Sequence, residues 1–278
     1  MKNTSKRPDK CAIFCICVLA FTLILIAAKV ACNVLTLDMF TGYYSAAGTF
    51  ISLYLPVICV VALALVCFIP KFGIEQAQTH NAKGVKMAAV VAAAGFAFYA
   101  FKCIELYMLY QALSRIQIVA LIASILSAVF FIMTAFAKQL ESAIYLICGI
   151  AVILFAVCAV SSSYFDLLTP MNSPIKLMNE LGALSLMLLM LSEMRATFDE
   201  ATKRRKLQLF SVSASVLMLG VSAIPSVICY LLGYLPYGYA LIFTDIVFVC
   251  AFVFATVRFI SLCFSTDTEA TEIGRAHV

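Results

Sequence analysis

Long apolar blocks alternate with short polar segments along the whole chain. Eight blocks can be delimited, at residues 11–37, 44–69, 87–110, 116–137, 142–162, 175–195, 207–232 and 237–264. Each is close to the roughly 20 apolar residues that an α-helix needs to cross about 30 Å of hydrocarbon. The pattern therefore predicts an all-α, polytopic integral membrane protein with about eight transmembrane helices.

The blocks leave only short segments outside the predicted bundle. We expect residues 1–10 to be a basic cytoplasmic N-terminus, residues 11–264 the transmembrane helical bundle and residues 265–271 a polar cytoplasmic tail. Residues 272–278 read EIGRAHV, which matches the translation of a common sequencing adapter. We therefore expect this heptapeptide to be an artefact and the natural C-terminus to lie further along the gene.

Composition supports a membrane protein and excludes a soluble one. Apolar residues make up 64% of the chain and charged residues 12%, against roughly 45–50% and about 25% in soluble domains. The net charge of +5 comes from basic residues between the apolar blocks, so we expect a lipid bilayer and no nucleic acid as partner. The expected location is the cell membrane, specifically the bacterial cytoplasmic membrane.

The distribution of Lys and Arg predicts the orientation of the bundle. With the N-terminus inside, fourteen of these residues fall on the cytoplasmic side, against four outside, namely Lys29, Lys102, Arg115 and Lys176. Such a bias marks the cytoplasmic side and predicts that both termini lie inside. The strongest signal is the run of Lys203, Arg204, Arg205 and Lys206. The same run could also contact a protein partner or anionic lipid at the cytoplasmic face.

Two short motifs indicate an internal repeat. The sequence DMFTG at residues 38–42 follows the first block, and DLLTP at residues 166–170 follows the fifth. Two parallel four-helix halves would result, an arrangement that occurs in transporters.

Five charged residues within the outer half of the predicted spans are the candidate functional residues. They are Lys29, Lys102, Glu105, Glu180 and Asp245. A charge at a helix centre costs about 2.5–3.5 kcal/mol, so such residues face the protein interior and mark pathways or pairs. One interpretation is a polar cavity that binds a solute or relays protons or cations. The other is a set of ion pairs that hold the helices together.

Two further placements follow from helical spacing. Ala89, Ala93 and Ala97 recur every four residues, which predicts a central helix and places Lys102 and Glu105 inside the bundle. At the inner end of the sixth block, Glu193 and Arg195 are expected to reach water as interfacial anchors.

Motifs for catalysis are absent from the sequence. It contains no HExxH, Walker GxxxxGK[ST] or GxSxG pattern, and its twelve cysteines form no CxxC pair. Its two histidines, His80 and His277, lie outside the predicted spans. We therefore expect no enzyme, no cofactor and no metal site. The function indicated is a permease or transporter-like module for a small solute or ion, and the alternative is a non-catalytic accessory or sensory membrane subunit.

Overall fold

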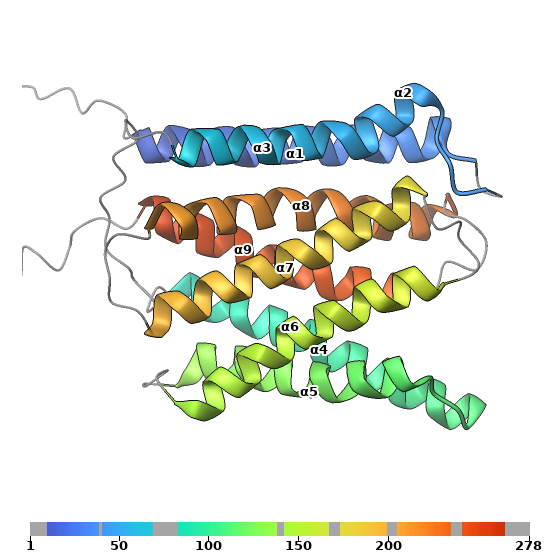
Figure 1. The fold of residues 1–278 in the computed structure, drawn as a ribbon, viewed down its shortest axis with the longest axis vertical. Coiled ribbons are helices and arrows are strands. Elements are labelled where there is room, and N and C mark those ends of the chain that lie inside the picture. The colour runs from blue at the N-terminus through green and yellow to red at the C-terminus, as the bar shows by residue number, and fades with distance from the viewer. Residues whose placement is uncertain are drawn as a thin grey trace, which may run out of the picture.

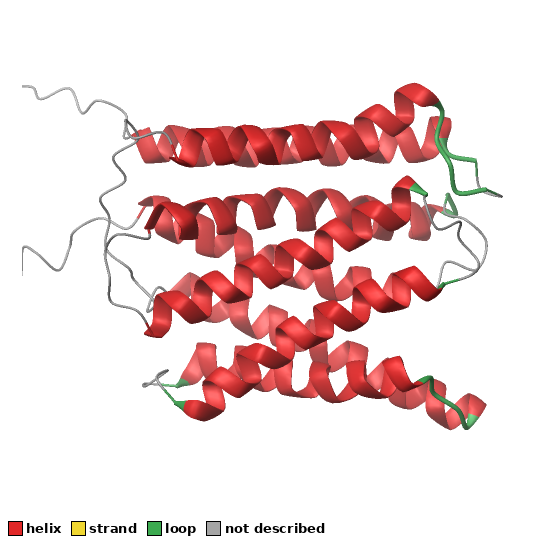
Figure 2. Ribbon diagram, viewed as in Figure 1, coloured by secondary structure: helices red, strands yellow, loops and turns green. Residues whose placement is uncertain are grey.

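The computed structural model describes residues 10–38, 41–68, 83–137, 142–166, 173–198, 205–234 and 241–264. Within these ranges the regular structure is helical, apart from a single bridge between Leu37 and Tyr44 (Figure 2). The helices are α1 (Lys10–Thr36), α2 (Ala46–Thr49), the π-helical turn η1 (Phe50–Tyr54), α3 (Leu55–Phe68), α4 (Lys83–Tyr110), α5 (Arg115–Phe136), α6 (Ala143–Phe165), α7 (Pro174–Phe198), α8 (Arg205–Leu232) and α9 (Ile242–Phe264).

Eight helical stretches of the described chain are long and apolar enough to cross a membrane, with α2, η1 and α3 counted as one. This confirms the prediction of a multi-pass, all-α membrane protein that contacts the lipid bilayer. Lys10 at the start of α1 and Phe264 at the end of α9 lie at the same end of the bundle (Figure 1). We call this the Lys10 end, and the opposite end, where Tyr44 lies, the Tyr44 end.

Six of the helices form a closed ring. Each helix from α4 to α9 packs against the next one along the chain, and α9 packs back against α4. The hairpin of α1 and α3 lies outside this ring and packs mainly against α8 (Figure 1). Helix α8 is thus shared between the ring and the hairpin. In its most apolar stretch 67% of α8 is buried, against 17% for the span of α2, η1 and α3.

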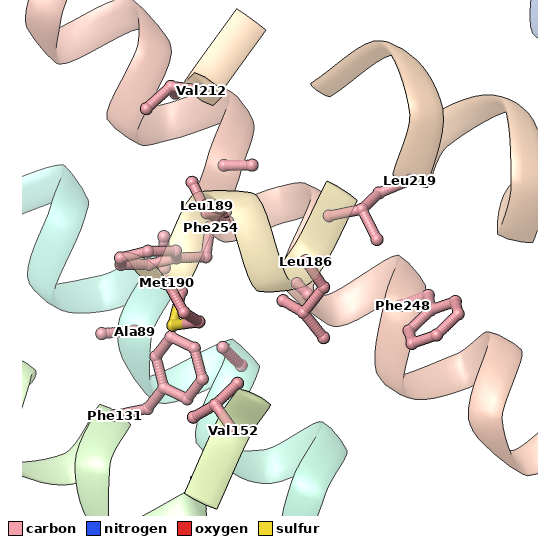
Figure 3. Close-up of a cluster of buried hydrophobic side chains, with 14 of the residues drawn as sticks. Ala89, Phe131, Val152, Leu186, Leu189, Met190, Val212, Leu219, Phe248 and Phe254 are labelled. Carbon is pink, nitrogen blue, oxygen red and sulfur yellow. The ribbon is translucent and has the colours of Figure 1, made fainter. Parts of the chain in front are cut away.

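The ring is filled by apolar side chains rather than by polar ones. Phe131 of α5 stacks on Phe96 of α4 at 5.5 Å and meets Phe254 of α9 edge to face at 5.1 Å. Met190 of α7 and Val152 of α6 are fully buried in the same cluster (Figure 3). This interdigitated core fixes how the ring helices lie against one another.

Local sequence explains where several helices begin. Helix α5 begins with a capping box, in which Ser114 and Gln117 each bond the other's backbone N–H. In α7, Pro174 occupies the first position, where its missing N–H costs nothing, and the Ser173 hydroxyl accepts from the Lys176 N–H at 3.3 Å. The π-helical turn η1 ends two residues before Pro56, whose ring cannot donate to the Ser52 carbonyl in a regular helix.

Candidate functional site

The five predicted charged residues include two lysines, and Lys29 is the more deeply buried of them. Its side chain extends from α1 and is 2% exposed. The Lys29 Nζ donates to the backbone carbonyl of Val221 in α8, at 3.0 Å. In a regular helix that carbonyl would accept from the N–H of residue 225, but residue 225 is a proline and has none. The ammonium therefore takes the place of a helical donor that the sequence has removed.

Asp245 supplies the negative charge of this site. It lies in the first turn of α9 and is 0% exposed. Its carboxylate acts electrostatically on the Lys29 ammonium, and the N-terminus of a helix favours a negative charge at that position. Two of the five predicted residues, on helices far apart in the sequence, are thus brought together in the half of the bundle toward the Tyr44 end.

A buried polar pair covers Lys29 on the side of the Tyr44 end. Asn33 follows Lys29 by one helical turn, and its Nδ2 donates to the Cys229 Sγ at 3.4 Å. The Tyr44 hydroxyl donates to Asn33 Oδ1 at 2.5 Å. Burial raises the pKa of the Tyr44 phenol above its ordinary value, so Tyr44 remains a donor at neutral pH. Sequence reasoning missed both residues, although Asn33 shares the helical face of Lys29.

The other three predicted residues do not join this pair. The Lys102 Nζ lies 2.6 Å from Glu105 Oε2, with the two side chains 28% and 43% exposed. The expectation that both face the bundle interior is wrong for Glu105, because the buried face of α4 is centred on Ala89 and Phe96, whereas Lys102 is half-buried. Glu105 is nine residues after Phe96, which at 3.6 residues per turn places it about 180° away on the helix.

Glu180 lies on α7 and is only partly buried. Lys176, one turn earlier, acts on it electrostatically. Lys176 itself is 1% exposed, and its Nζ donates to the backbone carbonyl of Asp166 at the end of α6. Lys176 therefore connects the Tyr44 ends of α6 and α7.

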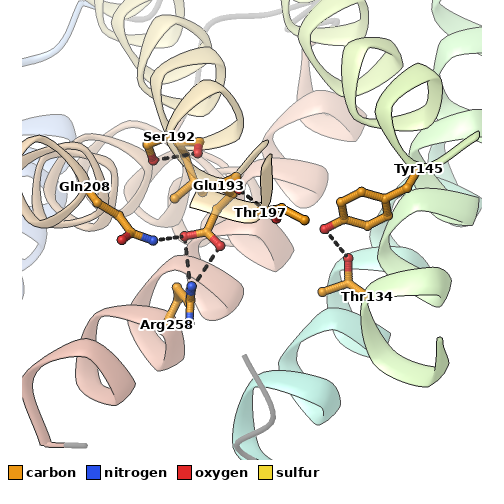
Figure 4. Close-up of polar contacts among 8 residues, drawn as sticks. Thr134, Tyr145, Ser192, Glu193, Thr197, Gln208 and Arg258 are labelled. Carbon is orange, nitrogen blue, oxygen red and sulfur yellow. Dashed lines mark hydrogen bonds and ion pairs between the residues drawn. The ribbon is translucent and has the colours of Figure 1, made fainter. Parts of the chain in front are cut away.

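A second buried ionic cluster lies toward the Lys10 end. Arg258 of α9 is 0% exposed, and its Nε lies 3.0 Å from each carboxylate oxygen of Glu193 in α7. The Gln208 Nε2 of α8 donates to Glu193 Oε1 at 3.3 Å (Figure 4). We name Glu193, Gln208 and Arg258 the Glu193 cluster.

The Glu193 cluster corrects one sequence prediction. Glu193 is 5% exposed and ion-paired, so it is not an interfacial anchor, whereas its neighbour Arg195 is exposed. The signal that could have found the pair is Arg258 itself. An arginine six residues before the end of an apolar span must pair within the protein or reach the interface, and Glu193 is an acid at the same depth.

Hydroxyl groups surround this cluster. The Tyr145 hydroxyl of α6 lies 3.3 Å from Thr134 Oγ1 of α5, and Glu193 and Arg258 both act on Tyr145 electrostatically. The Thr197 Oγ1 donates to the Glu193 carbonyl at 3.0 Å, on the side facing Tyr145 (Figure 4). Side chains from five helices thus meet at the Lys10 end.

Thiols and pockets add no further ligand set to these two centres. All twelve cysteines fall in the described chain as free thiols. Within the described ranges no three His, Cys, Asp or Glu side chains gather as metal ligands. A pocket of about 450 Å³ opens between α4 and α5, lined by Ile104, Tyr107, Gln111, Ala112, Leu113, Ile118 and Leu121. It contains none of the five predicted charged residues.

Several sequence predictions fall outside the described residues. These are the terminal segments 1–9 and 265–278, Lys203 and Arg204 of the basic run, both histidines and parts of the two repeat motifs. Of the basic run, Arg205 begins α8 and the Lys206 side chain is partly buried.

Comparison with protein-family models, with curated proteins and with solved structures finds no match to this chain. The site is therefore interpreted from its geometry and charge alone.

Proposed function

We propose that this protein is a permease or transporter-like module that moves a small solute or ion across a membrane, with Lys29 and Asp245 as its ion-coupling pair. The observation that carries the proposal is the Lys29 ammonium on the Val221 carbonyl, which Pro225 deprives of its helical donor. In many transporters, backbone carbonyls freed by a break in a helix coordinate the coupled ion, and Pro225 frees one such carbonyl within the continuous helix α8.

The chemistry of the pair suits exchange of a proton for a cation. When Lys29 is protonated, its ammonium donates to the Val221 carbonyl and offsets the charge of Asp245. When Lys29 releases its proton, a carbonyl oxygen and a carboxylate become available to a monovalent cation or to the cationic group of a solute. The neutral amine then remains buried at little cost, because only the charged form is penalised by a low dielectric.

Orientation belongs to the same proposal. The Lys10 end faces the cytoplasm of a bacterial cell, and the support for this is the bias of Lys and Arg toward that side. The proposal also includes a non-enzymatic role. It further includes an interaction of the basic run with lipid or protein at the cytoplasmic face. The two parallel halves stay a prediction: α4 packs with α5 as α8 packs with α9, but α1 and α3 pack on α8 and leave the first half divided.

A second candidate is a non-transporting accessory or sensory subunit. The tightly filled ring around Phe131 and Phe254 favours it. In such a protein the two buried ionic centres would only hold the helices together.

Lys29→Arg separates the two candidates. Arginine keeps the positive charge beside Asp245, but it does not release a proton at any accessible pH. In proteoliposomes with a trapped pH dye and an imposed Na⁺ or K⁺ gradient, we expect the wild type to move protons and Lys29→Arg to be inactive. Lys102→Arg is the matched control and should keep the wild-type rate. Equal proton movement by Lys29→Arg and the wild type, or none by either, would contradict the proposal.

A further inference from the structure

The Glu193 cluster connects two helices that scarcely contact each other elsewhere. Helices α7 and α9 flank α8 in the ring, and both pack extensively on α8 but only slightly on one another. The bond from Arg258 Nε to both oxygens of Glu193 joins them directly, at 3.0 Å. Gln208 adds α8 to the same cluster. One ionic contact therefore links α7 directly to α9 near the Lys10 end.

A line of small residues, one glycine and four serines, leads from this cluster toward Lys29. It follows the contact of α7 with α8 and consists of Gly182, Ser185, Ser211, Ser215 and Ser222, which we name the α7–α8 seam. The Ser215 hydroxyl donates across the seam to the Ser185 carbonyl at 2.8 Å. A Cβ on Gly182 would lie 2.4 Å from the Ser222 Oγ, so the helices touch there. Ser222 directly follows Val221, the acceptor of Lys29.

The Glu193 cluster lies at one end of the α7–α8 seam. Lys29 and Asp245 lie in the half of the bundle toward the Tyr44 end, and the Glu193 cluster lies between the seam and the Lys10 end. A buried ion pair is stable when both charges are present and costs several kcal/mol when one is left alone. Its two ions can separate only if water reaches both. Separation of α7 from α9 must therefore bring water to the Glu193 cluster, at the end of the seam nearest the Lys10 end.

We propose that the Glu193 cluster is the gate at the Lys10 end, which separates to let water and the transported ion reach Lys29 and Asp245 from that side. This inference rests on the proposed function. It identifies the contact between α7 and α9 as the one that opens, because carriers open a central site to one side of the membrane at a time.

The test measures access of a reagent to the seam and does not require a known substrate. Ser215→Cys places a thiol beneath the gate, at a position that is 0% exposed. In proteoliposomes, a membrane-impermeant maleimide is supplied from the Lys10 side, and labelling of residue 215 is followed by peptide-resolved mass spectrometry. The twelve native thiols are then scored separately and do not interfere.

The gate is removed with Glu193→Gln and Arg258→Gln together, because the double change leaves no lone buried charge. We expect residue 215 to be labelled at least about tenfold faster than with the pair intact, which corresponds to about 1.4 kcal/mol in the population of the open state. Lys102→Gln with Glu105→Gln is the matched control. It removes an ion pair of the same charges from the surface of α4, and labelling should not change.

If the double variant fails to accumulate in the membrane, Arg258→Lys is a second variant, which keeps both charges of the pair. Lysine lacks the planar fork of arginine, so labelling should rise by a smaller factor. Unchanged labelling of residue 215 in the gate variants would overturn the gate. If proton movement still depends on Lys29 while labelling is unchanged, only the gate fails. If labelling rises but no variant moves protons, the gate stands and the transport function fails.

Discussion

At the scale of single residues, a proline and a lysine on different helices each offset a cost that the other introduces. Pro225 leaves the Val221 carbonyl without a helical donor, and Lys29 brings a charge into an apolar span. Each alone would be costly in a membrane, since an unsatisfied carbonyl and a lone ammonium both lack water. Lys29 supplies the donor that Val221 lacks, and Asp245 brings an opposite charge to the same centre.

This mutual dependence predicts a specific pattern in a double-mutant cycle. Lys29→Met leaves Asp245 uncompensated and should destabilise the protein by about 3–5 kcal/mol. Lys29→Met with Asp245→Asn removes both charges, so most of the loss should be recovered. Apparent unfolding temperatures can be ranked with a thiol-reactive dye, because most of the native cysteines are buried.

The control for this cycle is Lys102→Met, which breaks an exposed pair worth less than about 1 kcal/mol. Additive losses in the double variant would show that Lys29 and Asp245 are independent.

Charge alone was enough to select Lys29 and Asp245 from the sequence, because an ionised side chain in a span needs a partner. The partners themselves could not be assigned, since they depend on which helices adjoin. The same gap explains the error at Glu193. Distance from the block end suggested contact with water, but the approach of α9 and α8 buries it.

At the scale of helices, the contact of α7 with α8 depends on a missing side chain. A Cβ on Gly182 would lie 3.0 Å from the Ser222 Cβ as well as 2.4 Å from its Oγ. Rotation of the serine hydroxyl cannot relieve the first of these contacts. The two backbones can therefore approach so closely only with glycine at this position.

Gly182→Ala should force α7 away from α8 and destabilise the protein by about 1–3 kcal/mol. Adding Ser222→Gly should restore most of the stability, because it removes both contacting atoms. Gly84→Ala is the control, because its Cβ would meet only one Val257 methyl, at 3.3 Å. Thermal unfolding in detergent measures all three, and equal stability of Gly182→Ala and the wild type would contradict the close contact.

Helix positions were well predicted from the sequence, and helix partners were not. The apolar blocks gave every span to within about five residues, because the length of a membrane helix is set by the bilayer. The alanine spacing in α4 correctly indicated a buried face through Ala89 and Ala93, but Ala97 is exposed and Lys102 lies off that face. The spacing of small residues identifies the buried face of a helix only when the residue at the centre of that face is known.

At the scale of the whole molecule, the arrangement is a six-helix ring with a hairpin attached to one of its helices. The apolar pattern does not separate α1 and α3 from the ring helices, since α5 and α6 of the ring are about as hydrophobic as they are. The distinction arises from packing: the α2–α3 span buries least and α8 buries most. Lys29 therefore reaches its partners from outside the ring.

The orientation of the bundle can be measured with paired fusions. A reporter that is active only in the cytoplasm should be active after Phe264, at the Lys10 end, because Lys and Arg gather on that side. The same reporter after Tyr234, at the Tyr44 end, should be inactive. The reverse pattern would invert the proposed orientation, and activity of both fusions would contradict the crossing of the membrane by α9.

The placement of Lys29 outside the ring has a consequence for biosynthesis. Val221 follows Lys29 by 192 residues. At roughly 5–20 residues per second, the ribosome needs roughly 10–40 s to deliver that acceptor, and longer to deliver Asp245. During this interval α1 is already in the bilayer, and its lysine, seven residues from the helix end, extends toward the headgroups. Burial of Lys29 is thus a late step of assembly, because α1 enters the membrane well before the helices that carry its partners.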